Sequence, residues 1–157
     1  MIAEKQYGVL FVCLGNICRS PLGEGIFRHL VEERHLEKHF LIDSCATGPW
    51  HTGEPPHKES RRIAKAHGLS IDNQRGRQIS DDDFFKFNLI LAMDQSIKAD
   101  LLALKIGDFA QIKLMREFDK IEEGLDVPDP FYGPCDGFKR VYDMIHRCCE
   151  ELLAEIV

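Results

Sequence analysis

The sequence lacks the features that would place the protein in a membrane or on a nucleic acid. It contains no continuous run of roughly 18 or more apolar residues, the length that a membrane-spanning helix requires. It shows no basic segment followed by an apolar one near residue 1, so no secretory leader is expected. It also lacks an excess of basic residues, since the formal net charge is −6. We therefore predict a cytoplasmic protein with no membrane and no nucleic-acid partner.

Motifs for metals and nucleotides are absent as well. The six cysteines form no paired Cys-x-x-Cys pattern of the kind that binds zinc, and neither G-x-G-x-x-G nor G-x-x-x-x-G-K-[ST] occurs. We expect no metal and no cofactor. The cysteines are expected to be reduced thiols, because 157 residues with 44% hydrophobic content can bury a core without disulfides. This length predicts one domain, residues 1–157.

Hydrophobic patterning predicts an α/β protein in which strands and helices alternate. Short apolar runs indicate buried strands, and apolar residues at helical spacing indicate amphipathic helices. The predicted strands are 9–12, 40–45, 88–93 and 112–115, and the predicted helices are 21–37, 57–67, 94–104 and 138–156. This alternation favours right-handed βαβ units and a parallel sheet with helices on both faces. A functional site is then expected beyond the carboxyl ends of the strands.

The segment YGVLFVCLGNICRSPLGE, residues 7–24, joins the first predicted strand to the first predicted helix. Ser20 suits the N-cap of that helix and Pro21 its first position. The preceding loop aims backbone N–H groups and the positive end of the helix dipole at one point, which suits a phosphate. The Arg19 guanidinium adds a planar fork of hydrogen-bond donors. Cys13 faces the same positive electrostatic field of the helix N-terminus and Arg19, which favours the thiolate form of its side chain. The loop thus predicts nucleophilic attack on phosphorus, although a lone cysteine more often only packs in the core.

The string VCLGNICRSP contains the pattern Cys-x5-Arg-Ser and resembles the phosphate-binding loop of the low-molecular-weight protein tyrosine phosphatase family. The resemblance implies a four-stranded parallel sheet flanked by helices on both faces, Rossmann-like or flavodoxin-like. It implies hydrolysis of phosphotyrosine and other aryl phosphates through a phosphocysteine intermediate on Cys13, with Arg19 binding the phosphate. Phosphotyrosine-containing proteins are then the expected substrates, and phosphate or another oxyanion the expected inhibitor. A monomer or weak homodimer is expected.

Further residues of the loop acquire roles from the same resemblance. Backbone N–H groups are expected to bind phosphate at Leu14, Gly15, Asn16, Ile17, Cys18 and Ser20. Gly15 and Asn16 are residue types that tolerate positive φ, which a tight cradle needs. The family also implies that the Asn16 side chain holds the loop and that the Ser20 hydroxyl binds the Cys13 sulfur. Ser44 matches a serine that braces the asparagine, but it suits a turn at a strand end equally well.

Asp129 is predicted to be the general acid that protonates the leaving oxygen and then the base for the water that hydrolyses phosphocysteine. It lies between two prolines in VPDPFY, residues 127–132, and they stiffen the backbone around it. The Asp-Pro-aromatic-Tyr signature is the acid site of the family. Asp119 and Asp126 lie nearby in the sequence, and we expect them to be merely solvated.

Three aromatic residues in loops, Trp50, Phe131 and Tyr132, are expected to line the substrate cleft. The family carries aromatic residues at these positions, and a deep slot between them would admit a phenyl phosphate and disfavour phosphoserine. Ile17 supports the same preference, because members that dephosphorylate arginine carry a threonine there. Protein arginine phosphatase activity is therefore the second choice within the class.

The resemblance also implies that Cys18 is a redox partner, because a disulfide with Cys13 would block the nucleophile reversibly. The alternative is a small buried residue in a tight loop. One region departs from the family, whose members often carry a histidine near residue 73 paired with the aspartate after the third strand. This chain has Asn73 and Gln74 there, and its Asp94 suits a helix N-cap better than a brace of the loop.

Two other functions are open on this fold. An arsenate-reductase-like thiol oxidoreductase would need two further cysteines near residues 80–90, and none occurs between Cys45 and Cys135. A non-catalytic phosphate-binding module would be expected if the cysteine, the arginine or the acid were missing, and all three are present. The sequence therefore favours a phosphatase over both.

Overall fold

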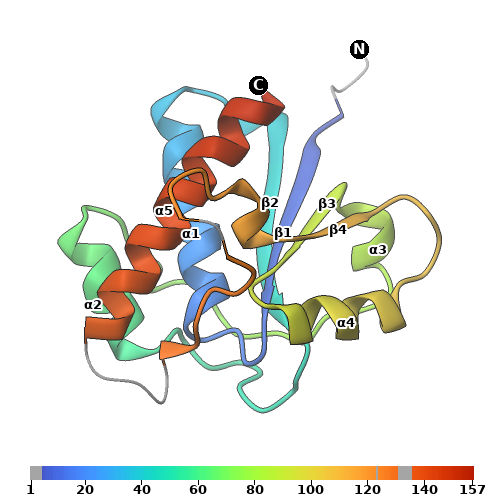
Figure 1. Ribbon diagram of the computed structural model, residues 1–157, viewed down its shortest axis with the longest axis horizontal. Helices are drawn as coiled ribbons and strands as arrows, with labels where there is room; N and C mark the ends of the chain where they lie inside the picture. The colour runs from blue at the N-terminus through green and yellow to red at the C-terminus, as the bar shows by residue number, and fades with distance from the viewer. Residues whose placement is uncertain (1–4, 123, 131–135) are drawn as a thin grey trace.

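The computed structural model describes residues 5–122, 124–130 and 136–157 (Figure 1). The strands are β1 (Tyr7–Cys13), β2 (Phe40–Ala46), β3 (Leu89–Ala92) and β4 (Gln111–Leu114). The α-helices are α1 (Arg19–Glu33), α2 (Lys58–Ala66), α3 (Asp83–Lys86), α4 (Gln95–Leu104) and α5 (Asp136–Ile156). Two 3-10 helices are η1 (Glu37–His39) and η2 (Met115–Phe118). Within these described ranges no helix is long and apolar enough to cross a lipid bilayer.

The four strands form one parallel sheet in the order β2-β1-β3-β4. β1 lies in the interior of the sheet, where Val9 pairs with Ile42 on one side and with Leu89 on the other. Interior strands of a parallel sheet are covered on both faces, which is why residues 9–12 form a continuous apolar run with no exposed surface. The predicted fold, a four-stranded parallel sheet flanked by helices, is confirmed.

Alternate residues of β1 point to opposite faces of the sheet and enter two separate cores. Val9 and Phe11 pack in the core that contains residues of α1, α2 and α5. Leu10 and Val12 pack in the core that contains residues of α3 and α4. Figure 1 shows the same division, with α1, α2 and α5 on one side of the sheet and α3 and α4 on the other. The loop that follows β1 therefore begins at the carboxyl end of an interior strand, between the two layers of helices.

Helix α1 begins at Arg19 rather than at Pro21, so Ser20 lies inside the helix and Cys18 takes the N-cap position. The prediction of Ser20 as the N-cap is therefore wrong. The Ser20 hydroxyl contacts the Cys13 sulfur instead of capping the helix backbone. Because the helix starts two positions earlier than predicted, the Arg19 side chain and the Ser20 hydroxyl both belong to its first turn, next to the loop of residues 14–18.

The ends of the next helices follow local backbone chemistry. Helix α1 stops at Glu33, before the predicted end at Glu37, and the His35 backbone that follows is left-handed with φ of 57°. Helix α2 matches its prediction, with His57 accepting a hydrogen bond as the N-cap. Gly68 follows α2 with φ of 83°, a conformation that glycine adopts without steric cost.

Asp119 is buried, which contradicts the prediction that it is a solvated loop residue. Its carboxylate accepts hydrogen bonds of 2.9 and 3.0 Å from Arg147 of α5, and others from the backbone of Ile121 and Glu122. Burial by itself raises the pKa of this carboxyl, but the hydrogen bonds from Arg147 and the backbone outweigh burial and hold the pKa well below its usual range. The ion pair with Arg147 ties the segment after η2 to α5.

Candidate active site

The loop of residues 14–18 connects the end of β1 at Cys13 to the start of α1 at Arg19. Asn16 has φ of 57°, a left-handed conformation that asparagine tolerates better than most residues. Gly15 does not share that conformation, so the expected reason for a glycine there is wrong. The actual reason is space, because a Cβ on Gly15 would lie 2.9 Å from the His51 ring. The loop is therefore tight for two different physical reasons at adjacent positions.

The Cys13 thiol lies at the start of this loop and is buried, with 2% of its surface exposed. Its Sγ lies 3.0 Å from Ser20 Oγ and accepts a hydrogen bond of 3.2 Å from the backbone N–H of Asn16. Donors at such positions stabilise negative charge on the sulfur. The contact between Ser20 and the Cys13 sulfur that the resemblance implies is thus present.

A chain of hydrogen bonds runs behind the loop. The Asn16 amide nitrogen donates to Ser20 Oγ at 2.8 Å and to Ser44 Oγ at 3.1 Å. Its oxygen accepts the backbone N–H of Arg77 at 3.1 Å, which fixes the orientation of the amide. Ser20 Oγ therefore accepts from Asn16, so its own proton can be donated to Cys13 Sγ. The amide thus gives the whole chain of hydrogen bonds a direction.

Glu24 of α1 stands at the far end of this chain. Ser44 donates its hydroxyl proton to Glu24 Oε1 at 2.7 Å, and Arg28 donates to Glu24 Oε2 at the same distance. Burial raises the pKa of the Glu24 carboxyl above its ordinary value, against the hydrogen bonds from Ser44 and Arg28, which lower it. Glu24 was not predicted from the sequence. A carboxylate between two glycines on an otherwise apolar helix face was the signal that could have found it.

The Arg19 guanidinium is almost fully buried, with 3% exposed. It donates to Asp94 Oδ2 at 2.6 Å and to the Val127 carbonyl at 3.0 Å, and its Nη2 lies 3.7 Å from Asp129 Oδ2. Burial lowers the pKa of Arg19, but the negative charges of Cys13, Asp94 and Asp129 outweigh burial and raise it above the ordinary value. A permanently charged fork of donors is thereby held beside the thiol.

Asp94 combines two roles that the sequence analysis set against each other. Its Oδ1 accepts the backbone N–H of Ile97 at 2.8 Å, which makes it the N-cap of α4. Its Oδ2 binds Arg19 across 75 residues of chain. The predicted N-cap is confirmed, and the contact with Arg19 is the additional finding. A local sequence pattern cannot predict this contact between Arg19 and Asp94, because the two residues are far apart in the sequence.

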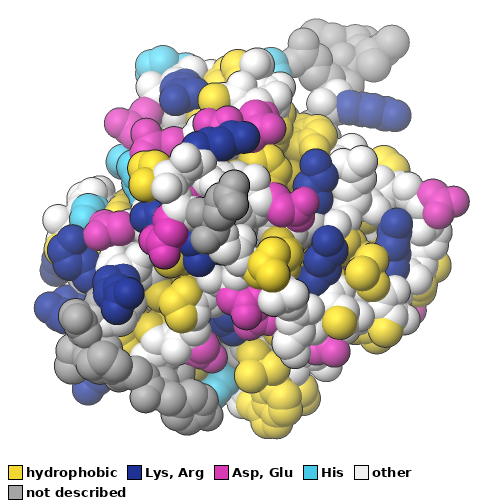
Figure 2. All heavy atoms as spheres, viewed as in Figure 1, with side chains coloured by type: hydrophobic (Ala, Val, Ile, Leu, Met, Phe, Trp, Pro, Cys, Tyr) yellow, Lys and Arg dark blue, Asp and Glu magenta, His cyan; other side chains and the backbone are white. Residues whose placement is uncertain are grey.

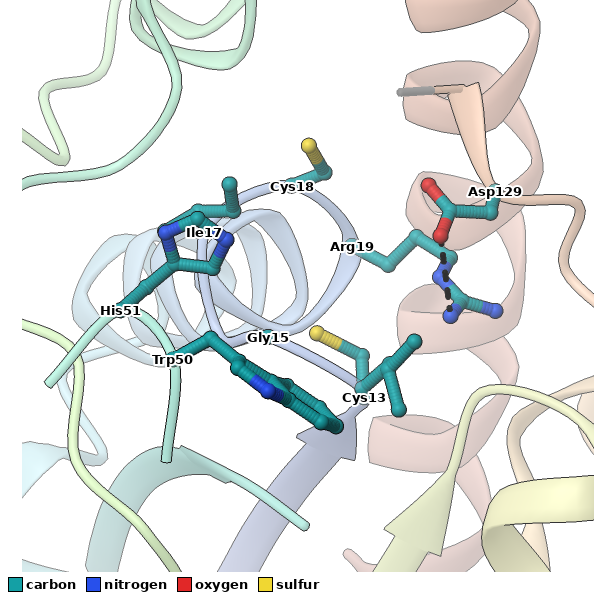
Figure 3. A pocket seen from close by; sticks show the side chains of 9 residues that line it. Cys13, Gly15, Ile17, Cys18, Arg19, Trp50, His51 and Asp129 are labelled. Atoms are coloured by element: carbon teal, nitrogen blue, oxygen red, sulfur yellow. Dashed lines mark ion pairs between the residues drawn. The ribbon is translucent and has the colours of Figure 1, made fainter. Parts of the chain in front are cut away.

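A cavity of about 450 Å³ opens over the loop (Figure 3). It is lined by Cys13, Leu14, Gly15, Ile17, Cys18, Arg19, Trp50, His51 and Asp129. In Figure 3, Asp129 faces Arg19, and Trp50 lies on the opposite side of the Cys13 thiol. The three residues predicted for catalysis therefore meet in one cavity.

The remaining predicted site residues divide into two groups. The side chains of Asn16, Ser20 and Ser44 do not line the cavity and make the hydrogen bonds described above. Phe131 and Tyr132 lie outside the described residues. The structure thus brings the loop residues and the acid together with Trp50, one of the three predicted aromatic residues.

The mouth of the cavity is formed in part by Trp50 and His51. Trp50 is exposed, and its ring lies against the Cα of Gly48, where any side chain would overlap it. The His51 ring nitrogen Nδ1 lies 2.9 Å from Glu54 Oε2. Sequence reasoning missed His51, whose only signal is its place next to Trp50.

Cys18 lines the same cavity as Cys13, and both are free thiols. Figure 3 shows the Cys18 thiol directed away from Cys13 Sγ. Burial raises the pKa of Cys18 to about 12, and the neighbouring charges of Cys13 and Asp129 add to the shift. Cys18 is therefore a neutral thiol near pH 7, packed with Ile17 and Phe138.

Gln74 occupies the region where a family histidine was expected. Its amide nitrogen donates to the Pro21 carbonyl at 3.1 Å, so it supports the first turn of α1. Ser44, which accepts from Asn16 as the resemblance implies, donates its hydroxyl proton to Glu24. In this chain the loop is braced from behind by the Glu24 carboxyl. In the described parts of the chain, no group of three His, Cys, Asp or Glu side chains is placed to hold a metal ion.

Comparison with known proteins gives consistent results. The family model for low molecular weight phosphotyrosine protein phosphatase matches residues 8–157. The low molecular weight protein-tyrosine-phosphatase YfkJ of Bacillus subtilis is 40% identical over 149 residues, which cover 94% of each protein. A crystal structure of a protein tyrosine phosphatase from Entamoeba histolytica matches with a TM-score of 0.91 at 34% identity, covering 96% of this chain and 97% of that one. The Drosophila arginine phosphatase matches with a TM-score of 0.87 at 35% identity, covering 94% and 96%.

The fold and the loop define an α/β protein with a cysteine-containing loop between the carboxyl end of its first strand and its first helix. The match extends over nearly the whole chain, well beyond that loop. The chain belongs to the low molecular weight phosphotyrosine protein phosphatase family, whose members are hydrolases that act on phosphoproteins.

Proposed function

We propose that this protein hydrolyses phosphotyrosine in proteins, with Cys13 as nucleophile, Arg19 as phosphate ligand and Asp129 as general acid and base. One observation carries the proposal. Cys13 Sγ, in hydrogen-bond contact with Ser20 and Asn16, lines the same cavity as Arg19 and Asp129. A nucleophile, a cation for the phosphate and a proton donor for the leaving group are the parts that the reaction needs.

The first step transfers the phosphoryl group to the enzyme. The Cys13 thiolate attacks phosphorus, the bond from phosphorus to the tyrosine oxygen breaks, and Asp129 gives its proton to the departing phenolate. Arg19 and the backbone N–H groups of residues 14–20 bind the three non-bridging oxygens and stabilise their charge in the transition state. The products of this step are a free tyrosine side chain and phosphocysteine.

The second step releases phosphate. The Asp129 carboxylate, now unprotonated, accepts a proton from the attacking water, and the oxygen of that water bonds to phosphorus. The bond from phosphorus to sulfur breaks, and the Ser20 hydroxyl donates to the departing Cys13 thiolate. The enzyme returns to its starting state with Asp129 protonated.

Apolar walls support an aromatic substrate. Ile17 is a largely buried wall residue, and Trp50 is an exposed aromatic residue at the mouth. Apolar walls of this kind favour a phenyl ring over the short side chain of phosphoserine. The likeness to the Drosophila arginine phosphatase supports phosphoarginine as the second candidate substrate.

Several finer properties belong to the same proposal. The Entamoeba structure is described with Hepes in its active site, and Hepes carries a sulfonate, so phosphate and related oxyanions are the proposed inhibitors. Cys18 is the proposed redox partner of Cys13, since both thiols line one cavity. We further propose one domain over residues 1–157, a cytoplasmic location, and a monomer or weak homodimer.

The direct test is the hydrolysis of para-nitrophenyl phosphate and of a phosphotyrosine peptide at about pH 5.5. Phosphoserine and phosphoarginine peptides serve as controls. We expect turnover in the presence of a chelator, loss of turnover in Cys13→Ser, and preference for phosphotyrosine. Absence of turnover in the intact reduced protein would replace the phosphatase with a phosphate-binding module.

A further inference from the structure

Helix α2 carries four cationic residues on one face. Lys58, Arg61, Arg62 and Lys65 follow the spacing i, i+3, i+4, i+7, which places them along one stripe of the helix. Ser60 and Ala64 are buried, on the opposite side of α2. We call these four residues the α2 stripe. Figure 2 shows dark blue side chains gathered at the left of the view, over α2 and the start of α5.

The α2 stripe begins beside the wall of the catalytic cavity. The backbone N–H of His57 donates to the Ile17 carbonyl at 2.7 Å. The Ser60 hydroxyl donates to the Cys18 carbonyl at 3.3 Å. Ile17 and Cys18 line the cavity, so the first turn of α2 is attached to the outer side of its wall. Lys58 directly follows His57, which is one of these two attachment points.

The start of α5 extends the positive surface. Phe138 stacks on His57 with 4.9 Å between ring centroids, which brings Lys139 and Arg140 to the same region as α2. Both are exposed. Lys139 is paired with Asp143 at 2.9 Å.

Carboxylates neutralise only part of this surface. Arg62 pairs with Glu59 at 2.6 Å. Among the side chains that the structure describes, Lys58, Arg61, Lys65 and Arg140 have no carboxylate oxygen within 4.0 Å. These four cations concentrate positive potential at one side of the site, whereas the chain as a whole carries a net charge of −6.

The other walls of the cavity differ in character. Leu14 and Trp50 present exposed apolar surface, and the His51 ring beside them lies 2.9 Å from the Glu54 carboxylate. Asp129 stands across the cavity from Ile17 (Figure 3). A peptide that enters the cavity therefore meets positive charge on the α2 side and apolar or negative surface on the others.

We propose that the α2 stripe binds an acidic segment of the substrate next to the phosphotyrosine. This inference rests on the proposed phosphatase function and names the substrate class of that site. The seven steps of helical rise from Lys58 to Lys65 span about 10 Å, which is the length of about three residues of extended peptide. The acidic residues therefore lie within the first few positions on one side of the phosphotyrosine. A peptide is favoured over a nucleic acid because the stripe is continuous with the cavity, while the rest of the chain is acidic.

The test compares three phosphotyrosine peptides of equal length. One carries three glutamates before the phosphotyrosine, one carries them after it, and one carries glutamines at both places. We expect kcat/KM for one acidic peptide to exceed that for the neutral peptide by about tenfold at low salt. The preference should shrink toward onefold as added salt shortens the range of the charges.

The two matched variants each remove two positive charges, one within the α2 stripe and the other elsewhere on the surface. Lys58→Gln/Arg61→Gln removes two cations of the stripe, and Lys5→Gln/Lys86→Gln removes two exposed cations elsewhere. We expect the acidic preference to fall to about onefold in the first variant and to persist in the second. This ratio of two substrates on one protein sample is independent of the fraction folded.

Three results would overturn the inference. One is equal kcat/KM for the three peptides in the wild-type protein. Another is a preference that persists in Lys58→Gln/Arg61→Gln. The third is a single-stranded DNA or a phosphatidylserine vesicle that inhibits at lower concentration than the acidic peptide, since it would assign the stripe to that polyanion. Failure of the proposed function is distinct, because the neutral peptide and para-nitrophenyl phosphate would then not be cleaved at all.

Discussion

Ser44 donates a hydrogen bond of 2.7 Å to Glu24, and this contact places a buried carboxyl at the end of the chain that leads to Cys13. Because the Ser44 hydroxyl donates its hydrogen bond to Glu24, the Ser44 oxygen serves as the acceptor for the Asn16 amide. Asn16 in turn donates to Ser20, whose proton is then available to the sulfur. A residue of helix α1 that does not line the cavity thus positions the group that contacts the nucleophile.

Replacing Glu24 should therefore change the chemistry of Cys13. We expect Glu24→Leu, which has similar shape but no acceptor, to lower kcat/KM for an aryl phosphate about tenfold, the effect of one lost hydrogen bond. The rate of alkylation of Cys13 by iodoacetamide at a fixed pH should also fall, because the sulfur loses a donor that stabilises its negative charge. Glu24→Gln keeps an acceptor oxygen and should restore most of both properties.

Glu32 provides the control for this experiment. It is exposed on the same helix, and Glu32→Gln should leave the alkylation rate unchanged. An unchanged alkylation rate in Glu24→Leu as well would mean that the carboxyl only fills space, and the positioning role would be withdrawn.

Asp94 offers a separation of catalysis from stability, because its two oxygens have different partners. Asp94→Asn keeps an N-cap side chain but loses the charge-assisted bond to Arg19, so kcat/KM should fall about tenfold with little change in Tm. Asp94→Ala loses the cap too, at a cost of about 1 kcal/mol, and should lower Tm by about 2–4 °C. Kinetics and calorimetry on both variants check this. A large loss of Tm in Asp94→Asn would contradict it.

The depressed pKa of Asp119 predicts how stability depends on pH. A carboxyl of this kind stabilises the fold fully above its unfolded pKa of about 3.9, and the contribution is lost as the pH falls toward the folded pKa. We expect Asp119→Asn to lower the free energy of unfolding by about 2 kcal/mol at pH 7. The difference from the wild type should shrink below about pH 4.

Urea unfolding at a series of pH values measures this difference. Asp108→Asn, at an exposed position in the loop after α4, is the control and should match the wild type throughout. A wild-type difference that stays constant from pH 7 to about pH 3 would show that the Asp119 charge is not the source of the stability.

Ile17 tests the preference for an aromatic substrate. Ile17→Thr and Ile17→Val have nearly the same shape and differ by one hydroxyl. We expect Ile17→Thr to lower the ratio of phosphotyrosine to phosphoarginine hydrolysis about tenfold, because the hydroxyl favours a polar guanidinium over a ring. Ile17→Val should keep the wild-type ratio. Equal ratios in the two variants would remove Ile17 from the determinants of specificity.

The sequence predicts the parts of this protein that depend on local patterns. The strands follow from short apolar runs, and the cradle follows from ten contiguous residues around Cys13. Contacts between distant segments were not predictable in this way. Asp119 looked solvated because its partner Arg147 lies 28 residues further along the chain. The bond from Arg19 to Asp94 spans 75 residues.

A second kind of error concerns residues with a plausible local role. Ser20 is a good N-cap type directly before a proline, and local propensity favours that position. The helix nevertheless begins one residue before it, and the hydroxyl serves the thiol. Glu24 was not predicted, because apolar periodicity does not reveal a buried carboxyl that accepts from two donors.

The most direct test of the account is detection of phosphate on Cys13. With para-nitrophenyl phosphate the leaving group departs without an acid, so Asp129→Ala should still form the intermediate while its hydrolysis, which needs the base, is slowed. Rapid mixing, acid quench and peptide mapping by mass spectrometry should then find one phosphate on the peptide that contains Cys13. Turnover without any phosphate on that peptide, or turnover that survives in Cys13→Ser, would contradict the assignment of Cys13 as the nucleophile.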